Sequence, residues 1–230
     1  MTRPLIGTGI DRVDGRKKVT GGATYAAEVQ VANVAHAVIV GATVGRGRIT
    51  AIETRAAEAA PGVLAVVTHL NAPKFPGVSA KTESNDRVVQ GLQDDAVLYH
   101  DQPIAVVVAD TLERAQHAAA LVTAEYDAAP AIGELEGDLA AAFVPDTPRG
   151  PLRTTRGDVA AGLAAAATRL EVTYTTPVET HNAMEPHATI AVWQGADHLT
   201  LYDSTQAIFN VRRRLSAMLG LAPENVRVIN

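Results

Sequence analysis

The fold class is indicated most strongly by the segment DQPIAVVVADT, residues 101–111. Its centre, Ile104 to Ala109, is a continuous apolar run of the kind found in strands of sheets that are covered on their faces. Asp110 is a candidate cap for a following helix, with Glu113 three residues later as in a capping box. That helix carries one apolar stripe, made of Leu112, Ala115, Ala119 and Val122. The segment therefore predicts a buried strand followed by an amphipathic helix.

Further elements extend this unit on both sides. Residues 34–40 and 64–68 are apolar and branched, and 123–126 follows the helix as another strand. Residues 49–60 have helical spacing, and Pro61-Gly62 ends them. We therefore expect an α/β unit over residues 19–128, preceded by an N-terminal extension over 1–18.

A second unit is expected after a region rich in chain-breaking residues. Proline and glycine are densest in residues 129–156, which favours a linker. In residues 157–230, Asp158 can cap an Ala-rich helix, and residues 170–174 alternate as a half-buried strand would. The fold class expected for the whole chain is α/β with mixed α+β character.

The last seventy residues predict a hairpin, a helix and a strand. Residues 189–193 and 199–202 are the expected hairpin strands. Ser204 can cap a helix that Gly220 would end, and residues 225–229 begin another strand. The helix has one apolar stripe, made of Ile208, Val211, Leu215 and Met218.

Composition excludes several classes of function. The chain has 230 residues, a net charge of −5 and no cysteine, so a basic nucleic-acid-binding field, a Cys-ligated iron–sulfur cluster and a thiol nucleophile are not expected. The basic cluster Arg212 to Arg214 is interpreted as a solvated helix face or a contact between subunits. No stretch approaches a membrane span and no leader pattern opens the chain, so we expect a cytoplasmic protein.

Three motifs together resemble a known family. The segment 101–111, with its helix and the strand VTAEY (122–126), resembles the α/β hammerhead domain of the xanthine dehydrogenase and aldehyde oxidase large subunit. HNAMEPHA (181–188) and DSTQ (203–206) are similar to the start of the first molybdopterin-binding domain of that subunit. Asp101 stands where the family usually has glycine. The resemblance implies a hammerhead-type domain followed by the beginning of a mixed-sheet molybdopterin-binding domain.

The resemblance also implies a site and its cofactors. In the family, the glutamine of the STQ motif hydrogen-bonds the apical oxo ligand of molybdenum, and that role falls to Gln206. The cofactor would be a molybdopterin, either as such or as its cytosine dinucleotide, with 2Fe-2S and FAD carried by partner subunits. A small aldehyde or N-heterocycle would be oxidised, with water supplying the oxygen. From the residues alone, Gln206 is equally an ordinary polar residue of a first helical turn.

Other candidate residues have two interpretations each. Met184, Glu185 and Pro186 would line the substrate funnel of the assembled enzyme or form only a polar loop. His181, Glu185 and His187 could be interpreted as a His/Glu/His metal site if they lay on one face of a helix. Pro186 argues against a helix here, so we expect no metal bound by side chains of this chain.

We expect the active site to be incomplete in these 230 residues. The family's glycine-rich loop and its general-base glutamate have no counterpart in this sequence, which suggests a fragment or one piece of a split subunit. The alternative is that the chain is a non-catalytic assembly module. An independent hydrolase or transferase is not supported, because the sequence contains no complete set of catalytic residues for either. The substrate, the nucleotide form of the pterin and the oligomeric state are not specified by these residues.

Overall fold

The computed structural model describes residues 6–75, 91–131, 133, 136–144 and 154–230. Contacts divide the chain into two compact units, residues 1–131 with 183–230, and residues 132–182. The expected α/β class with mixed α+β character is confirmed, because helices accompany three small sheets. No helix among the described residues is long and apolar enough to cross a membrane.

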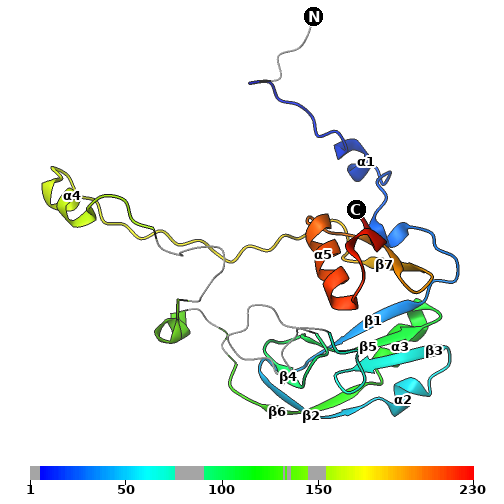
Figure 1. Cartoon of the computed structure of the whole chain (residues 1–230). Coiled ribbons are helices and arrows are strands. Elements are labelled where there is room, and N and C mark those ends of the chain that lie inside the picture. The colour runs from blue at the N-terminus through cyan, green and yellow to red at the C-terminus, as the bar shows by residue number, and fades with distance from the viewer. Residues whose placement is uncertain (1–5, 76–90, 132, 134–135, 145–153) are drawn as a thin grey trace, which may run out of the picture. The chain divides into compact units, whose positions relative to one another are not determined.

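The first sheet is built around the segment that indicated the fold. Its strands are β1 (His36–Gly41), β3 (Val63–Thr68) and β5 (Pro103–Ala109) in the order β1-β5-β3, and both neighbours run antiparallel to β5. Figure 1 shows β5 between the other two strands. The three strands expected from the sequence are therefore confirmed, and the most continuously apolar one lies at the centre.

One face of this sheet is covered by helices. The helix α2 (Arg55–Glu58) packs against β3, and α3 (Leu112–Ala119) packs against β1 and β5. The buried cluster between them consists of Ala57, Val66, Ala105, Val107, Ala118 and Val122. Val107 is fully buried at its centre. This cluster is the main core of the unit.

The opposite face of the same sheet is covered only in part by the described residues. Ile104 is buried in a second cluster, but Val106 and Val108 are only half-buried. Val106 lies opposite Ile39 of β1 and Val67 of β3, and Ile39 is 63% exposed. The apolar run of β5 predicts that both faces of the sheet are covered. Among the described residues, both faces are covered only near Ile104.

The second sheet joins β4 (Ala96–Val97), β2 (Gly47–Glu53) and β6 (Thr123–Ala128) in that order, all antiparallel. The expected helix over 49–60 is wrong in its first half. A register irregularity between Ile49 and Ala51 interrupts the alternation of β2, and both Ile49 and Ile52 pack in the second cluster. A bulge thus gives a strand the three-residue spacing that helices show.

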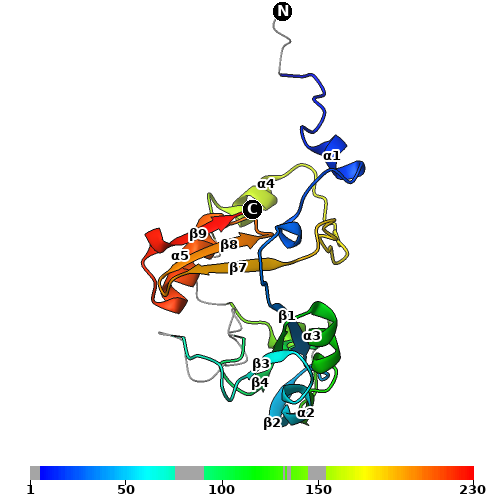
Figure 2. The same cartoon turned by 90° about the vertical axis from the view of Figure 1, so that its right-hand side faces the viewer.

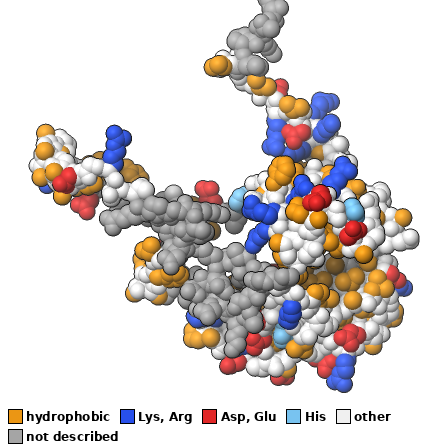
Figure 3. Space-filling model, in the orientation of Figure 1, with side chains coloured by type: hydrophobic (Ala, Val, Ile, Leu, Met, Phe, Trp, Pro, Cys, Tyr) orange, Lys and Arg blue, Asp and Glu red, His pale blue; other side chains and the backbone are white. Residues whose placement is uncertain are grey.

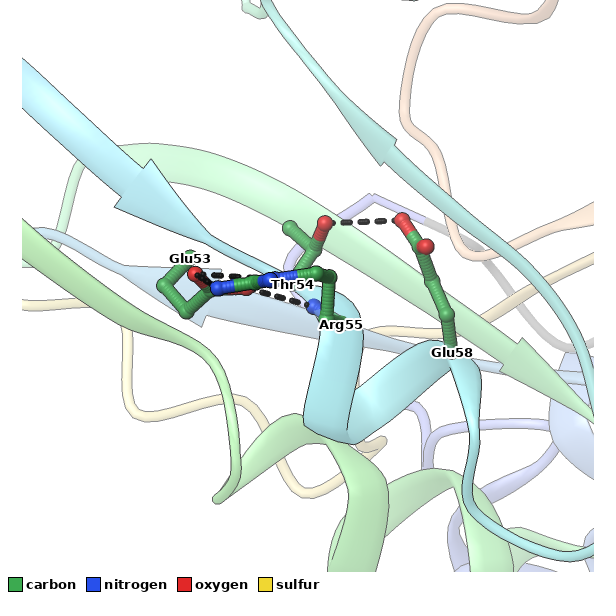
Figure 4. A network of polar contacts seen from close by, with 4 residues as sticks. All are labelled: Glu53, Thr54, Arg55 and Glu58. Atoms are coloured by element: carbon green, nitrogen blue, oxygen red, sulfur yellow. Dashed lines mark hydrogen bonds and ion pairs between the residues drawn. The ribbon is translucent and has the colours of Figure 1, made fainter.

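The change from β2 to α2 is fixed by a network of exposed polar side chains, drawn in Figure 4. The Glu53 carboxylate accepts hydrogen bonds from the Arg55 amide and guanidinium, both at 2.9 Å. Thr54 Oγ1 donates to Glu58 at 2.7 Å. The Arg55 hydrogen bonds lower the pKa of Glu53 to about 2. The network satisfies amide and side-chain donors where the strand ends.

The cap of α3 is one residue later than expected. Thr111 accepts from the Arg114 amide at 3.3 Å, whereas Asp110 forms an ion pair with the Arg114 guanidinium at 2.5 Å. The expected apolar stripe is also partly wrong. Ala115 and Ala118 are buried, while Leu112 is exposed. The buried side chains are small, because alanine lets the helix approach the sheet closely.

Asp101, at the position where the resembled family has glycine, adopts a left-handed conformation with φ of 67°. Its amide donates to Ala42 at 2.8 Å and so joins β1 to the turn before β5. Glycine adopts this conformation without strain, and aspartate is among the side chains that tolerate it best. Aspartate therefore occupies this position with little backbone strain.

The third sheet confirms the expected hairpin and last strand. Its strands are β7 (Thr189–Gln194), β8 (His198–Asp203) and β9 (Val226–Ile229), with β7 antiparallel and β9 parallel to β8. Figure 2 shows the three strands side by side, with α5 (Ile208–Leu219) next to them. Gly220 ends α5 with φ of 68°, as expected of a C-terminal glycine, and η3 (Pro223–Asn225) leads into β9.

The unit of residues 132–182 contains η2 (Glu136–Ala141) and α4 (Val159–Ala165). Asp158 caps α4 by accepting from the Ala161 amide at 2.9 Å, as expected. The strand expected over 170–174 is wrong, because these residues are extended but exposed and pair with no strand of the described chain. Alternating apolar side chains form a strand only where a partner strand is available.

Candidate functional site

Gln206 lies in the turn between β8 and α5. Its side chain is exposed and makes no hydrogen bond to the described residues. The expectation that Ser204 caps α5 is wrong, because the helix begins at Ile208 and its N-cap position is Ala207. Ser204 lies too far upstream of the first helical amides to reach them. The turn consequently presents the Gln206 amide with its donors and acceptor available.

The backbone of this turn is fixed from both sides. Ser204 Oγ lies 3.3 Å from both the amide nitrogen and the carbonyl oxygen of Ala188, accepting from the first and donating to the second. Thr205 Oγ1 accepts from the Ala207 amide at 3.1 Å. The Thr205 carbonyl accepts from the Asn230 side chain at the end of β9. Gln206 therefore projects from a turn that its neighbours hold.

Met184, Glu185 and Pro186 form an irregular turn shortly before β7. Met184 and Pro186 are exposed, but Glu185 is half-buried and accepts from the Ala26 amide at 3.1 Å. Ala26 begins η1 (Ala26–Glu28), which follows α1 (Gly15–Val19) along the chain. Sequence reasoning missed this contact, since the two residues are 159 positions apart.

The remaining polar candidates do not form a catalytic group. His181 and His187 are exposed, and no three His, Asp or Glu side chains in the described ranges could hold a metal ion together. In the basic cluster, Arg212 donates to the Pro223 carbonyl at 2.6 Å, while Arg213 and Arg214 are exposed. Figure 3 shows acidic and basic side chains interspersed over the visible face.

The third sheet thus ends in a turn that presents a neutral side-chain amide, in the same chain as the α/β unit built on the first two sheets.

Comparison with known proteins identifies the family. Residues 20–130 match the family described as "Aldehyde oxidase and xanthine dehydrogenase, a/b hammerhead domain", and residues 143–230 match "Molybdopterin cofactor-binding domain". The chain belongs to the aldehyde oxidase and xanthine dehydrogenase family, as the three sequence motifs indicated.

Two relatives illustrate the range of sequence similarity. The aldehyde oxidoreductase molybdenum-binding subunit PaoC of Escherichia coli (strain K12) is 40% identical, over 98% of this chain and 30% of the relative. The nicotinate dehydrogenase large molybdopterin subunit of Eubacterium barkeri is 31% identical, over 98% of this chain and 53% of the relative. The chain thus spans about a third to a half of the length of these relatives.

Solved structures share the fold. Quinoline 2-oxidoreductase from Pseudomonas putida 86 superposes with a TM-score of 0.75 at 22% identity, covering 99% of this chain and 30% of that one. The aldehyde oxidoreductase from Desulfovibrio gigas gives a TM-score of 0.74 at 22% identity, covering 95% and 26%. The fold of this chain is therefore shared with part of each of these two oxidoreductases.

Proposed function

We propose that this chain is the amino-terminal part of a molybdenum-binding large subunit whose complete form oxidises aldehydes, with N-heterocycles as the second substrate class. The main support for this proposal is the 40% identity to an aldehyde oxidoreductase subunit, together with the match of residues 143–230 to a molybdopterin-binding domain. The reaction converts an aldehyde and water into a carboxylic acid, two electrons and two protons. The electrons leave the subunit through partner proteins.

The role proposed for Gln206 is that its side-chain amide would donate a hydrogen bond to an oxo ligand of the molybdenum cofactor. The cofactor, when bound, supplies the two-electron oxidation. An amide offers N–H donors without adding charge beside a metal that changes oxidation state. The exposed Gln206 side chain makes no hydrogen bond to the described residues, so it fits this role without breaking an existing contact.

The remaining parts of the proposal concern what surrounds this chain. The pterin is a molybdopterin, either as such or as its cytosine dinucleotide. The 2Fe-2S clusters belong to partner subunits, because this chain has no cysteine with which to hold a cluster, and FAD belongs to a partner subunit as well. The general base is supplied by polypeptide other than this chain. Met184, Glu185 and Pro186 line the route of the substrate, and the enzyme is cytoplasmic.

The test uses the complete subunit expressed with its partners. Molybdenum content is measured by mass spectrometry, and turnover is measured with an aldehyde and an artificial electron acceptor. Gln206→Ala should lower kcat by about 10- to 100-fold, as loss of a group that orients a metal site does. Gln206→Glu should lower it further, because a carboxylate places negative charge beside the oxo group.

A matched control separates this role from a general effect of losing an amide. Gln194→Ala removes another exposed glutamine, which lies at the end of β7 and outside the turn that carries Gln206. This variant should leave kcat unchanged. An assembled enzyme without molybdenum would refute the proposal. In that case the assembly-module alternative would gain support if the metal-free protein still bound its partner subunits.

A further inference from the structure

The last hydrogen-bonded pair of the β7–β8 ladder is completed by a side chain. The ladder pairs Thr189 with Asp203, so the next pair is Ala188 with Ser204. The Ser204 amide donates to the Ala188 carbonyl at 3.4 Å, as a backbone ladder requires. The Ala188 amide, however, is met by Ser204 Oγ at 3.3 Å. The hydroxyl takes the place that a backbone carbonyl would have in a regular pair.

This substitution determines where the strand ends. Because the Ser204 hydroxyl satisfies the Ala188 amide, the Ser204 carbonyl is released from the ladder and the chain can turn at once. The turn follows directly, with the Thr205 amide donating to the Asp203 carbonyl at 2.9 Å. The preceding pair is also locked, since Thr189 Oγ1 donates to the Asp203 carboxylate. Ser204 is thus the point at which the strand becomes the turn that carries Gln206.

The turn has further supports downstream, but none of them involves the Gln206 side chain. Thr205 holds the Ala207 amide, and Asn230 holds the Thr205 carbonyl. The position of the Gln206 amide is therefore set by the backbone on either side of it. Ser204 itself is held by the ladder bond of its amide and by its hydroxyl, which is bonded to both polar atoms of Ala188.

We propose that Ser204 is a positioning residue, whose hydroxyl fixes the backbone turn that presents Gln206 to the cofactor. This inference rests on the proposed function, and it assigns Ser204 no contact with substrate or cofactor. Catalytic groups lose activity when they are displaced by about 1 Å, by up to about 100-fold. A partial release of the turn should accordingly lower kcat by about tenfold and leave KM nearly unchanged.

The test compares Ser204→Ala with Ser204→Thr in the assembled enzyme. Alanine removes the hydroxyl, whereas threonine keeps an oxygen at the same position and should restore kcat. Thr200→Ala is the matched control, because Thr200 lies on the same strand and has no side-chain hydrogen bond to the described residues. Hydrogen exchange at the Ala188 amide should accelerate in Ser204→Ala and remain slow in Ser204→Thr and in Thr200→Ala.

A double variant tests whether Ser204 acts through Gln206. In a Gln206→Ala background, Ser204→Ala should lower kcat no further. An equal additional loss would overturn the proposal, and so would a molybdenum-containing Ser204→Ala enzyme with wild-type kcat or unchanged exchange at Ala188. A wild-type enzyme without molybdenum would instead overturn the proposed function, so the two failures are distinguishable.

Discussion

Replacing Val107 with alanine tests the account of the first sheet. Val107 lies at the centre of β5, is fully buried, and belongs to the cluster that α2 and α3 cover. The change removes two methyl groups, each worth about 0.8 kcal/mol of transfer free energy. The cavity left in the core adds to this loss. We therefore expect Val107→Ala to lower the free energy of unfolding by about 2 to 3 kcal/mol.

The adjacent Val106 is a matched control on the same strand. Its side chain is only half-buried on the opposite face of the sheet, so Val106→Ala should cost less than about 1 kcal/mol in the isolated chain. Urea unfolding followed by far-ultraviolet circular dichroism measures both variants. Equal losses in the two variants would refute the conclusion that the described residues cover mainly one face of this sheet.

Three further predictions concern local contacts. Gly220→Ala should cost about 1 kcal/mol, because φ at this position is 68°, and an unshifted urea midpoint would contradict this. The pKa of Glu53 is lowered from 4.5 to about 2 by Arg55, so its stabilising effect is complete above about pH 4.5 and lost as the pH falls toward 2. Stability curves of wild type and Glu53→Gln should converge across that window, and parallel curves would count against the ion pair. Glu185→Ala removes the acceptor of the Ala26 amide and should cost about 1 kcal/mol by urea unfolding, whereas Glu185→Gln keeps an oxygen and should cost less.

Continuous apolar runs were the part of the fold that sequence predicted best. The strand over 104–109 was identified because six successive apolar residues fit neither a surface helix nor a loop. The segment 49–53 was mistaken for helix because the bulge in β2 brings Ile49 and Ile52 to one cluster. A bulge depends on the partner strand, which a local pattern does not contain.

Two cap assignments were wrong, while those of Asp158 and Gly220 were confirmed. The Ser204 side chain is bound to Ala188 of another segment, a competition that tertiary structure decides. The Asp110 side chain is bound to Arg114 in the first turn of α3 itself, so the neighbouring Thr111 caps the helix. The expected place of Gln206 in a first helical turn was wrong, because α5 begins only at Ile208, and the supports of the turn that carries Gln206 came only from the structure. The role of Gln206 and the division into domains at 18, 128 and 156 stay predictions.

The central place of β5 affects how the protein is made. Among the strands of the described residues, β1 and β3 do not pair with each other, and each pairs only with β5, which is translated after both. On the ribosome, the first two apolar strands emerge before their shared partner exists, so the sheet cannot form until β5 has left the exit tunnel. Pairing over such sequence separations is slow, and unpaired strand edges invite aggregation. Recombinant yield should therefore improve under slow induction at low temperature or with added chaperones.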